Sequence, residues 1–310
     1  MTDSRLDFRI SHRISQGVNL CFYLLGKGQL RLPALARPAL WPAPDADPFA
    51  DFARRFEAVE AHGLDARQVD PLWRSWLRAV AQTCPDSAAD ALSAMPDLLA
   101  RPQVRTQFQR FGRMHLNDFL ERWTGVMLDI EGRLQKALRS FDSARILAQH
   151  QEALGAEFRP GRAVGHYHLL RTFSVNRFGS SFVFGAAYLD HPHRLADATA
   201  HETLHVLVAQ TDAWQREDIR PLLAGLEPML AETHLRPIDA VEEVVCLLVG
   251  MLEHEGEAAP LERLEGRIPQ APLRAIARAL YEHRRTRHSQ GFAQWIAASL
   301  QQAGRTRRGP

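Results

Sequence analysis

Hydrophobic residues recur every three or four positions over much of the first half of the chain, which is the spacing of an amphipathic α-helix. Stripes of this kind run over 49–59 and 69–80, and a longer one extends from Leu116 to Leu134. The long stripe predicts a helix of about four to six turns that packs on its neighbours. A proline-dense segment, 30–48, precedes these stripes and is typical of an extended connector.

Aromatic and β-branched residues become common in the middle of the chain. They fill two segments on either side of the polar, glycine-containing connector NRFGSS, and this pattern predicts a β-hairpin over 163–189. A short strand is also expected near Phe8 to Ile10. Helical patterning resumes at about Leu195, with one helix expected over 195–211 and another over 238–254.

This order of helices, a small sheet and further helices predicts an α+β protein that is predominantly α-helical. A length of 310 residues suffices for about two domains of ordinary size. We expect a mainly helical N-terminal region over 1–155, followed by a second region over 156–310. The second region would hold the hairpin and the two later helices.

Composition and charge narrow the class of protein. Hydrophobic residues make up 45% and charged residues 24% of the chain, which is the balance of a globular protein and excludes wholesale disorder. Lys plus Arg (38) against Asp plus Glu (36) leaves a formal charge of +2, so we expect no nucleic-acid partner. The three cysteines lack CxxC spacing, which argues against a disulfide framework and favours a reducing compartment.

Neither a secretory signal nor a membrane span is expected. The first residues carry dispersed charges without a continuous apolar stretch. The most apolar helical segment, around Val241 to Leu252, includes Glu242 and Glu243. We therefore expect a cytoplasmic protein without a membrane partner.

The clearest chemical signal is HETLH at 201–205, an H-E-x-x-H match in a segment free of glycine and proline. Four residues turn an α-helix by about 400°, so His201 and His205 project from one face and can reach one zinc ion. Glu202 lies beside that face, where its carboxylate could accept a proton from a metal-bound water.

Tetrahedral zinc with three protein ligands keeps a fourth position for water, so one more side chain is required. The helix expected over 238–254 offers Glu242 and Glu243. Its apolar face would bury this helix, so one of the two acids has to point toward the core or a partner. Spacing alone leaves the choice between them open.

HETLH followed by a glutamate on a second helix resembles the gluzincin group of zinc metallopeptidases. The third ligand in that group is such a glutamate, often with a small residue three positions on, which implies Glu243 with Cys246. The resemblance covers roughly 161–255 and implies a zincin-like core there. The helical first half is similar to that of bacterial zincin-like proteins with helical extensions.

Two features separate the chain from the better-known gluzincins. A gap of 37 residues lies between His205 and Glu243, and no asparagine precedes that glutamate, so the resemblance does not carry over a substrate class. The metzincin pattern needs a glycine and a third histidine soon after the motif, and VLVAQTDAW supplies neither.

We therefore predict a zinc-dependent hydrolase, with Zn²⁺ as cofactor and a peptide or protein as substrate. Glu202 would be the general base of this metallopeptidase. Tyr281 and His283 are candidate donors to the transition-state oxyanion. The strand expected over Ser181 to Leu189 could align a peptide by strand addition. The alternative is a non-catalytic zincin scaffold that acts as a binding or sensory module.

A second histidine pair, His166 and His168, is two residues apart on a predicted strand and therefore shares a face. No third ligand follows from its spacing. The pair could line the cleft, but we expect exposed or ordinarily hydrogen-bonded histidines there.

Overall fold

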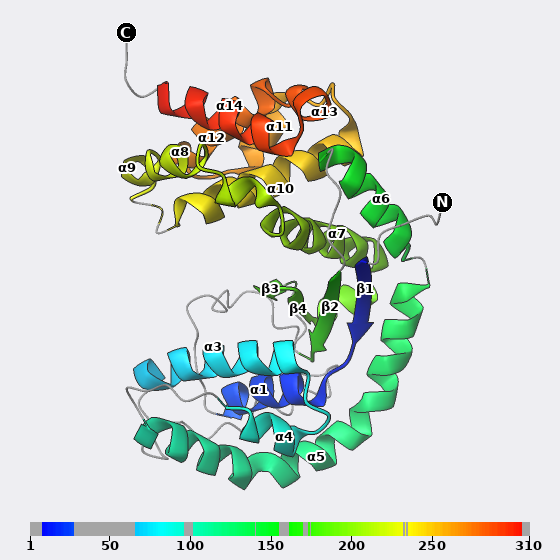
Figure 1. Ribbon diagram of the computed structural model, residues 1–310. Helices are drawn as coiled ribbons and strands as arrows, with labels where there is room; N and C mark the ends of the chain where they lie inside the picture. Colours follow the sequence, from blue (N-terminus) through cyan, green and yellow to red (C-terminus); the bar gives the residue numbers. More distant parts are fainter. Residues whose placement is uncertain are drawn as a thin grey trace, which may run out of the picture. The chain divides into compact units, whose positions relative to one another are not determined.

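The computed structural model describes residues 8–27, 66–95, 102–139, 141–154, 161–169, 173, 175–231, 233 and 235–305. Over these residues the protein is α+β and mostly helical, with one four-stranded sheet, which confirms the predicted class (Figure 1). The expected connector over 30–48 and the helix expected over 49–59 lie outside the described residues.

The chain divides into two compact units. The sheet unit comprises 10–141 and 162–198, and the helical unit comprises 1–9, 142–161 and 199–310. Both units draw residues from either side of the boundary expected at 155, because β1, near the N-terminus, joins the same sheet as strands that come after residue 160.

Amphipathic helices make up most of the described residues of the sheet unit. In the 10–141 segment of this unit the described helices are α1 (Gln16–Lys27), α3 (Ala66–Thr83), α4 (Ala88–Ser93) and α5 (Pro102–Leu138). Helix α3 contains the stripe predicted over 69–80. Helix α5 spans 37 residues and is longer than predicted, because Phe108 and Phe111 extend its buried face ahead of Leu116.

The four strands of the sheet come from two parts of the chain, one near the N-terminus and one over 161–185. They are β1 (Phe8–Arg13), β2 (Gly161–His168), β3 (Val175–Phe178) and β4 (Ser181–Gly185), in the order β1-β2-β4-β3. The first of them contains the strand predicted near Phe8 to Ile10. All five residues of β4 are buried, as suits a strand with neighbours on both sides.

The hairpin predicted over 163–189 differs in topology from the observed sheet. Strands β3 and β4 are antiparallel and turn at Gly179, whose φ of +62° favours glycine. Strand β2 instead pairs with β4 in parallel, with Val164 opposite Ser181. After Gly185 the chain forms the 3₁₀ helix η4 (Ala186–Asp190) rather than extending the strand to Leu189. Short buried runs in parallel and antiparallel strands have similar composition, so the pattern did not define the pairing.

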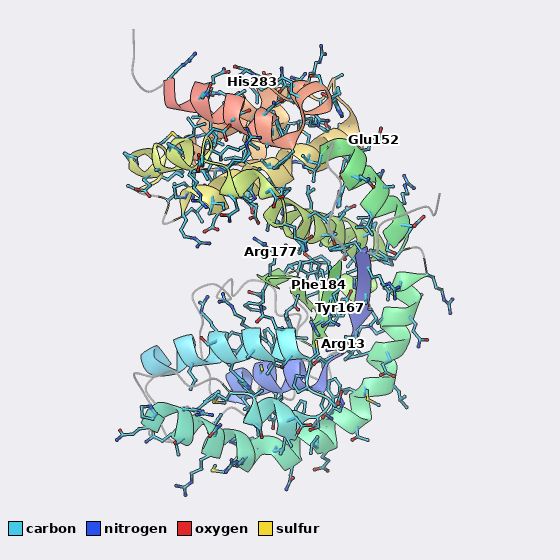
Figure 2. The ribbon with its side chains drawn as sticks, viewed as in Figure 1. Arg13, Glu152, Tyr167, Arg177, Phe184 and His283 are labelled. Carbon is cyan, nitrogen blue, oxygen red and sulfur yellow. The ribbon has the colours of Figure 1, made fainter. Side chains whose placement is uncertain are left out.

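Aromatic packing and one asparagine join the sheet to α1. Tyr167 of β2 and Phe184 of β4 stack with ring centroids 5.4 Å apart (Figure 2). Asn19 of α1 donates through Nδ2 to the Tyr167 carbonyl at 2.7 Å and accepts from the Leu169 amide at 3.0 Å. These two hydrogen bonds satisfy backbone groups at the end of β2 and anchor α1 on it.

Helices make up most of the described residues of the helical unit. They are α6 (Ser143–Leu154), the part of α7 (Pro192–Ala209) from Thr199 onward, η5 (Asp212–Gln215), α8 (Arg220–Ala224), α9 (Glu227–Leu230), α10 (Pro237–Glu255), α11 (Leu261–Arg267), α12 (Ala271–Glu282), α13 (Thr286–Gln290) and α14 (Phe292–Arg305). Helices α7 and α10 confirm those predicted over 195–211 and 238–254.

Helix α10 is the buried centre of the helical unit and contacts α6, α11 and α12. It begins with Pro237 in the first turn and ends at Gly256, whose φ of +78° stops the helix. Val244, Val245 and Leu248 are fully buried along it. Among the described helices, α10 included, none combines the length and apolar character that a membrane crossing requires.

Candidate metal centre

Helix α7 brings the two histidines of HETLH together, as the spacing predicted. The ring centroids of His201 and His205 are 4.8 Å apart, with ring planes at 87°, and their Nε2 atoms are 3.2 Å apart. The helix runs without a break from Pro192 to Ala209, so both imidazoles leave one face, one turn apart.

Glu243 of α10 adds a carboxylate to this histidine pair. Its Oε2 atom lies 3.2 Å from His205 Nε2. One ligand atom from each of His201, His205 and Glu243 lies within 4.8 Å of the others. The three donors come from two helices of the helical unit and converge on one point.

The donor set suits a tetrahedral zinc ion. Zinc binds nitrogen and oxygen at about 2.0–2.1 Å, and tetrahedral geometry then separates two ligand atoms by about 3.3 Å. The 3.2 Å separations of His205 Nε2 from His201 Nε2 and from Glu243 Oε2 fit this value. The Glu243 side chain is 44% exposed, so the cluster faces solvent on one side and a further ligand could reach it.

Glu242 has a different position from its neighbour. It is buried, and its Oε1 atom lies 2.8 Å from Nδ1 of His205. A carboxylate on the far nitrogen of a metal-binding histidine fixes the ring orientation and makes the other nitrogen a better donor. Of the two acids left open by spacing, the structure therefore brings Glu243 to the histidine pair and places Glu242 behind His205.

The surroundings of His205 favour a positive charge on its ring. Burial alone lowers its pKa, but hydrogen bonds to Cys246, Glu242 and Glu243 outweigh burial and raise the pKa well above the ordinary value of 6.5. Burial in turn raises the pKa of the Cys246 thiol to about 11, partly offset by His205. With a pKa of about 11 the thiol is protonated at pH 7.

Glu202 follows His201 directly on α7 and is partly exposed. Consecutive residues of a helix point about 100° apart, so Glu202 flanks the face that carries the histidines instead of lying on it. The role of Glu202 as general base stays a prediction.

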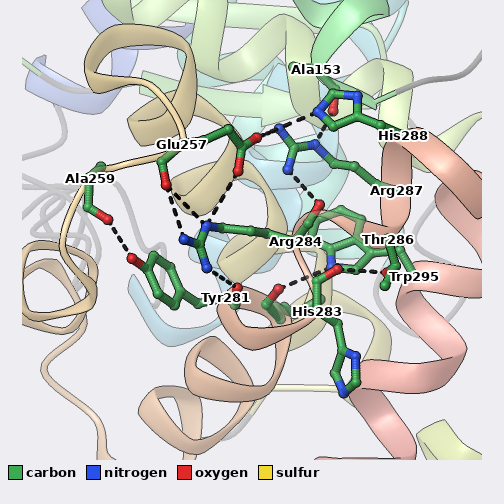
Figure 3. A network of polar contacts seen from close by, with 11 residues as sticks. Ala153, Glu257, Ala259, Tyr281, His283, Arg284, Thr286, Arg287, His288 and Trp295 are labelled. Carbon is green, nitrogen blue, oxygen red and sulfur yellow. Dashed lines mark hydrogen bonds and ion pairs between the residues drawn. The ribbon is translucent and has the colours of Figure 1, made fainter.

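The structure does not bring Tyr281 and His283 to this cluster. The Tyr281 hydroxyl donates to the Ala259 carbonyl at 2.6 Å, and the Arg284 guanidinium lies over its ring. His283 Nε2 bonds to Gln302. Figure 3 shows both residues at the end of α12, in a polar network around Glu257. Only the residue types of Tyr281 and His283 had suggested oxyanion donors. The sequence pattern did not indicate that the end of α12 places them away from the cluster.

The second histidine pair lies in the sheet unit and has other partners. His166 Nε2 is 3.5 Å from Cys84 Sγ, and the His168 ring stacks on Phe22 at 3.9 Å. Burial, with a smaller effect of Arg13, lowers the pKa of His166 to about 4, and burial lowers that of His168 to about 3. Both rings are therefore neutral at pH 7.

Sequence reasoning missed the contact between Glu242 and His205 and a further buried pair, His150 with Glu253. The available signal was that Glu242 and Glu253 both interrupt the apolar side of the α10 sequence. A buried acid needs a partner, so each of them indicated a polar contact.

Comparison with protein-family models, curated proteins and solved structures finds no match for this chain. Function therefore has to be inferred from the residues of the site.

Proposed function

We propose that this protein is a zinc-dependent hydrolase, most simply a metallopeptidase, in which His201, His205 and Glu243 hold the ion. The observation that carries the proposal is the convergence of these three donors from α7 and α10, with two separations of 3.2 Å. Imidazole and carboxylate donors at this spacing suit zinc. Bound zinc supplies Lewis acidity, which polarises a carbonyl group and makes water more acidic.

The protein's own residues have separate tasks in this proposal. Glu242 holds the His205 ring so that Nε2 faces the metal position. Glu202 accepts the proton of the attacking water and later returns it to the leaving amine. Partial exposure of His201 and Glu243 lets substrate and water approach this side of the cluster.

The resemblance of HETLH and Glu243 to gluzincins supports a zincin-like core and a peptide or protein substrate. It does not indicate which peptide. We place the activity in the cytoplasm, because Cys21, Cys84 and Cys246 are all free thiols, as suits a reducing compartment.

The decisive test compares Glu202→Gln with the unchanged protein at matched zinc content, on a panel of peptides that includes N-terminally blocked ones. Gln keeps the shape and polarity of Glu202 but accepts no proton. Turnover should fall by about 10²- to 10⁴-fold while zinc content and thermal stability stay the same. Removal of zinc with a chelator should abolish cleavage, and added zinc should restore it.

Three outcomes would contradict parts of the proposal. Equal cleavage by both proteins would assign the chemistry to another group. Zinc binding without cleavage of any peptide would favour the non-catalytic scaffold. Less than about 0.3 zinc per chain, with no uptake on titration, would remove the metal centre itself.

A further inference from the structure

His150 is a buried histidine outside the donor set, and it links α7 and α10, the two helices that carry the donors. His150 of α6 is 1% exposed. Its Nδ1 atom lies 2.7 Å from Oε1 of Glu253 on α10, and its Nε2 atom lies 2.9 Å from the carbonyl oxygen of Ala200 on α7. Ala200 directly precedes His201. All of these residues belong to the helical unit.

The chemistry of the partners defines the protons on this ring. A carbonyl oxygen only accepts, so Nε2 of His150 carries a hydrogen and donates it to Ala200. At 2.7 Å a proton must also lie between Nδ1 and the Glu253 carboxyl group, on one or the other. Both contacts are therefore hydrogen bonds, and together they fix the plane of the His150 ring.

Helix α10 uses one face for two such contacts. Glu242 and Glu253 are 11 residues apart, which corresponds to about 20° around the helix and about 16 Å along it. Glu242 bonds to His205 of α7, and Glu253 reaches α7 through His150. A single hydrogen bond between two helices lets one turn against the other, whereas a second attachment at this distance opposes that rotation.

The rotation matters because the donors are divided between the helices. Glu243 belongs to α10, whereas His201 and His205 belong to α7. A carboxylate on α10 lies about 6 Å from the helix axis. If α10 turns about that axis by about 20°, the carboxylate moves by about 2 Å, which is a whole metal–ligand bond length. Tight zinc binding thus requires the two helices to keep one relative setting.

We propose that His150 and Glu253 are a positioning pair for the metal centre, which holds α7 and α10 so that Glu243 meets His201 and His205. This inference rests on the proposed zinc site. The pair touches neither the metal position nor the substrate. Its effect is therefore expected in metal affinity and coordination geometry.

The test replaces the pair by apolar residues, His150→Phe with Glu253→Leu, in the full-length protein. Exchange of a buried polar pair for packed apolar residues often leaves stability unchanged or raises it, so the protein should fold. Zinc affinity, measured by competition with a chromophoric chelator, should fall by about 10- to 100-fold. The visible absorption spectrum of Co²⁺ bound in place of zinc should change as well, because it reports ligand geometry.

Two further variants separate positioning from general support. Arg287→Met removes another buried polar anchor of α6, the bond from Arg287 Nε to the Ala153 carbonyl at 2.6 Å, without touching α7 (Figure 3). Its zinc affinity should stay within about twofold. Glu253→Gln can donate an amide hydrogen to Nδ1 while Nε2 still donates to Ala200, so affinity and Co²⁺ spectrum should be close to those of the unchanged protein.

The outcomes distinguish this inference from the function on which it rests. Unchanged affinity and spectrum in a folded double variant, or an equal loss in Arg287→Met, would overturn the positioning role while the zinc site stands. Failure of the unchanged protein to bind zinc would overturn both. If the double variant does not fold, Glu253→Leu alone is the test, and there an affinity loss supports the role and unchanged affinity overturns it.

Discussion

Each unit of the protein buries histidines, but the two units surround them differently. In the sheet unit, His166 meets the Cys84 thiol and His168 stacks on Phe22. In the helical unit, His205 meets Glu242 and Glu243, and His150 meets Glu253. Burial lowers the pKa of His168 to about 3, whereas at His205 hydrogen bonds to Cys246, Glu242 and Glu243 outweigh burial and raise the pKa.

The comparison teaches that histidine spacing by itself does not indicate a metal site. His166 and His168 share a strand face just as His201 and His205 share a helix face. A cation is stabilised only where negative groups accompany the imidazoles, and among these pairs that condition holds in the helical unit. Four predictions test whether this difference in surroundings decides function.

The largest effect is expected from removal of one histidine in each unit. His205→Ala deletes a donor and should reduce bound zinc to a small fraction of one ion per chain. His166→Ala should leave zinc content unchanged, because its partner is a thiol in the sheet unit. Elemental analysis after gel filtration measures both. Loss of zinc in both variants would refute the assignment of the site to α7 and α10.

Zinc should stabilise the helical unit and not the sheet unit. An ion at 100 times its dissociation constant adds about 2.7 kcal/mol to the free energy of unfolding of the part that binds it. Hydrogen exchange followed by mass spectrometry should then show about 100-fold slower opening in α7 and α10. Peptides from β2 and β4 should exchange at the same rate with and without zinc. Equal protection of these strands would contradict the local assignment.

Removal of the carboxylate behind His205 should weaken zinc binding without abolishing it. Glu242→Ala frees the ring to turn, and such a loss reduces metal affinity by about 10- to 100-fold. Glu242→Gln can still accept a hydrogen bond from Nδ1 and should lose less. Asp239→Asn, on the same helix but paired with Arg236 at the surface, is the matched control and should bind zinc normally. An affinity for Glu242→Ala equal to that of this control would show that Glu242 does not hold His205.

Local geometry explains which parts of this site could be predicted from sequence. The spacing of His201 and His205, the helix over 238–254 and the pairing with Glu243 follow from turns of single helices and a family resemblance. The contacts of Glu242 with His205 and of Glu253 with His150 depend on how separate helices rotate against each other. That rotation is set by packing over the whole unit, and no short pattern encodes it.

The sheet illustrates the same limit. Buried runs predicted strands at β2 and β4. That β2 and β4 pair in parallel, with β3 at the edge of the sheet, depends on the path of the chain between these strands. The helix at 69–80 was predictable because its apolar stripe alone defines its buried face. The partners of Tyr281 and His283 also depend on their position in the fold. The structure bonds them to Ala259 and Gln302 and not to the metal cluster.

The smallest expected effect is the loss of stability of the sheet unit at acidic pH. His166 and His168 have folded-state pKa values of about 4 and about 3, below the ordinary value of 6.5. The unfolded chain therefore binds protons that the folded chain rejects. The stabilising contribution is complete above pH 6.5 and is lost as the pH falls below that value. Between pH 7.5 and 5.5 each histidine should reduce the free energy of unfolding by about 1 kcal/mol.

His168→Phe keeps an aromatic ring against Phe22 but cannot be protonated, so its loss of stability over this pH interval should be smaller by about that amount. Urea unfolding at the two pH values, with zinc removed from both proteins, measures the difference. An identical pH dependence of the two proteins would show that His168 is not held neutral by burial, and the contrast between the two units would then fail at that residue.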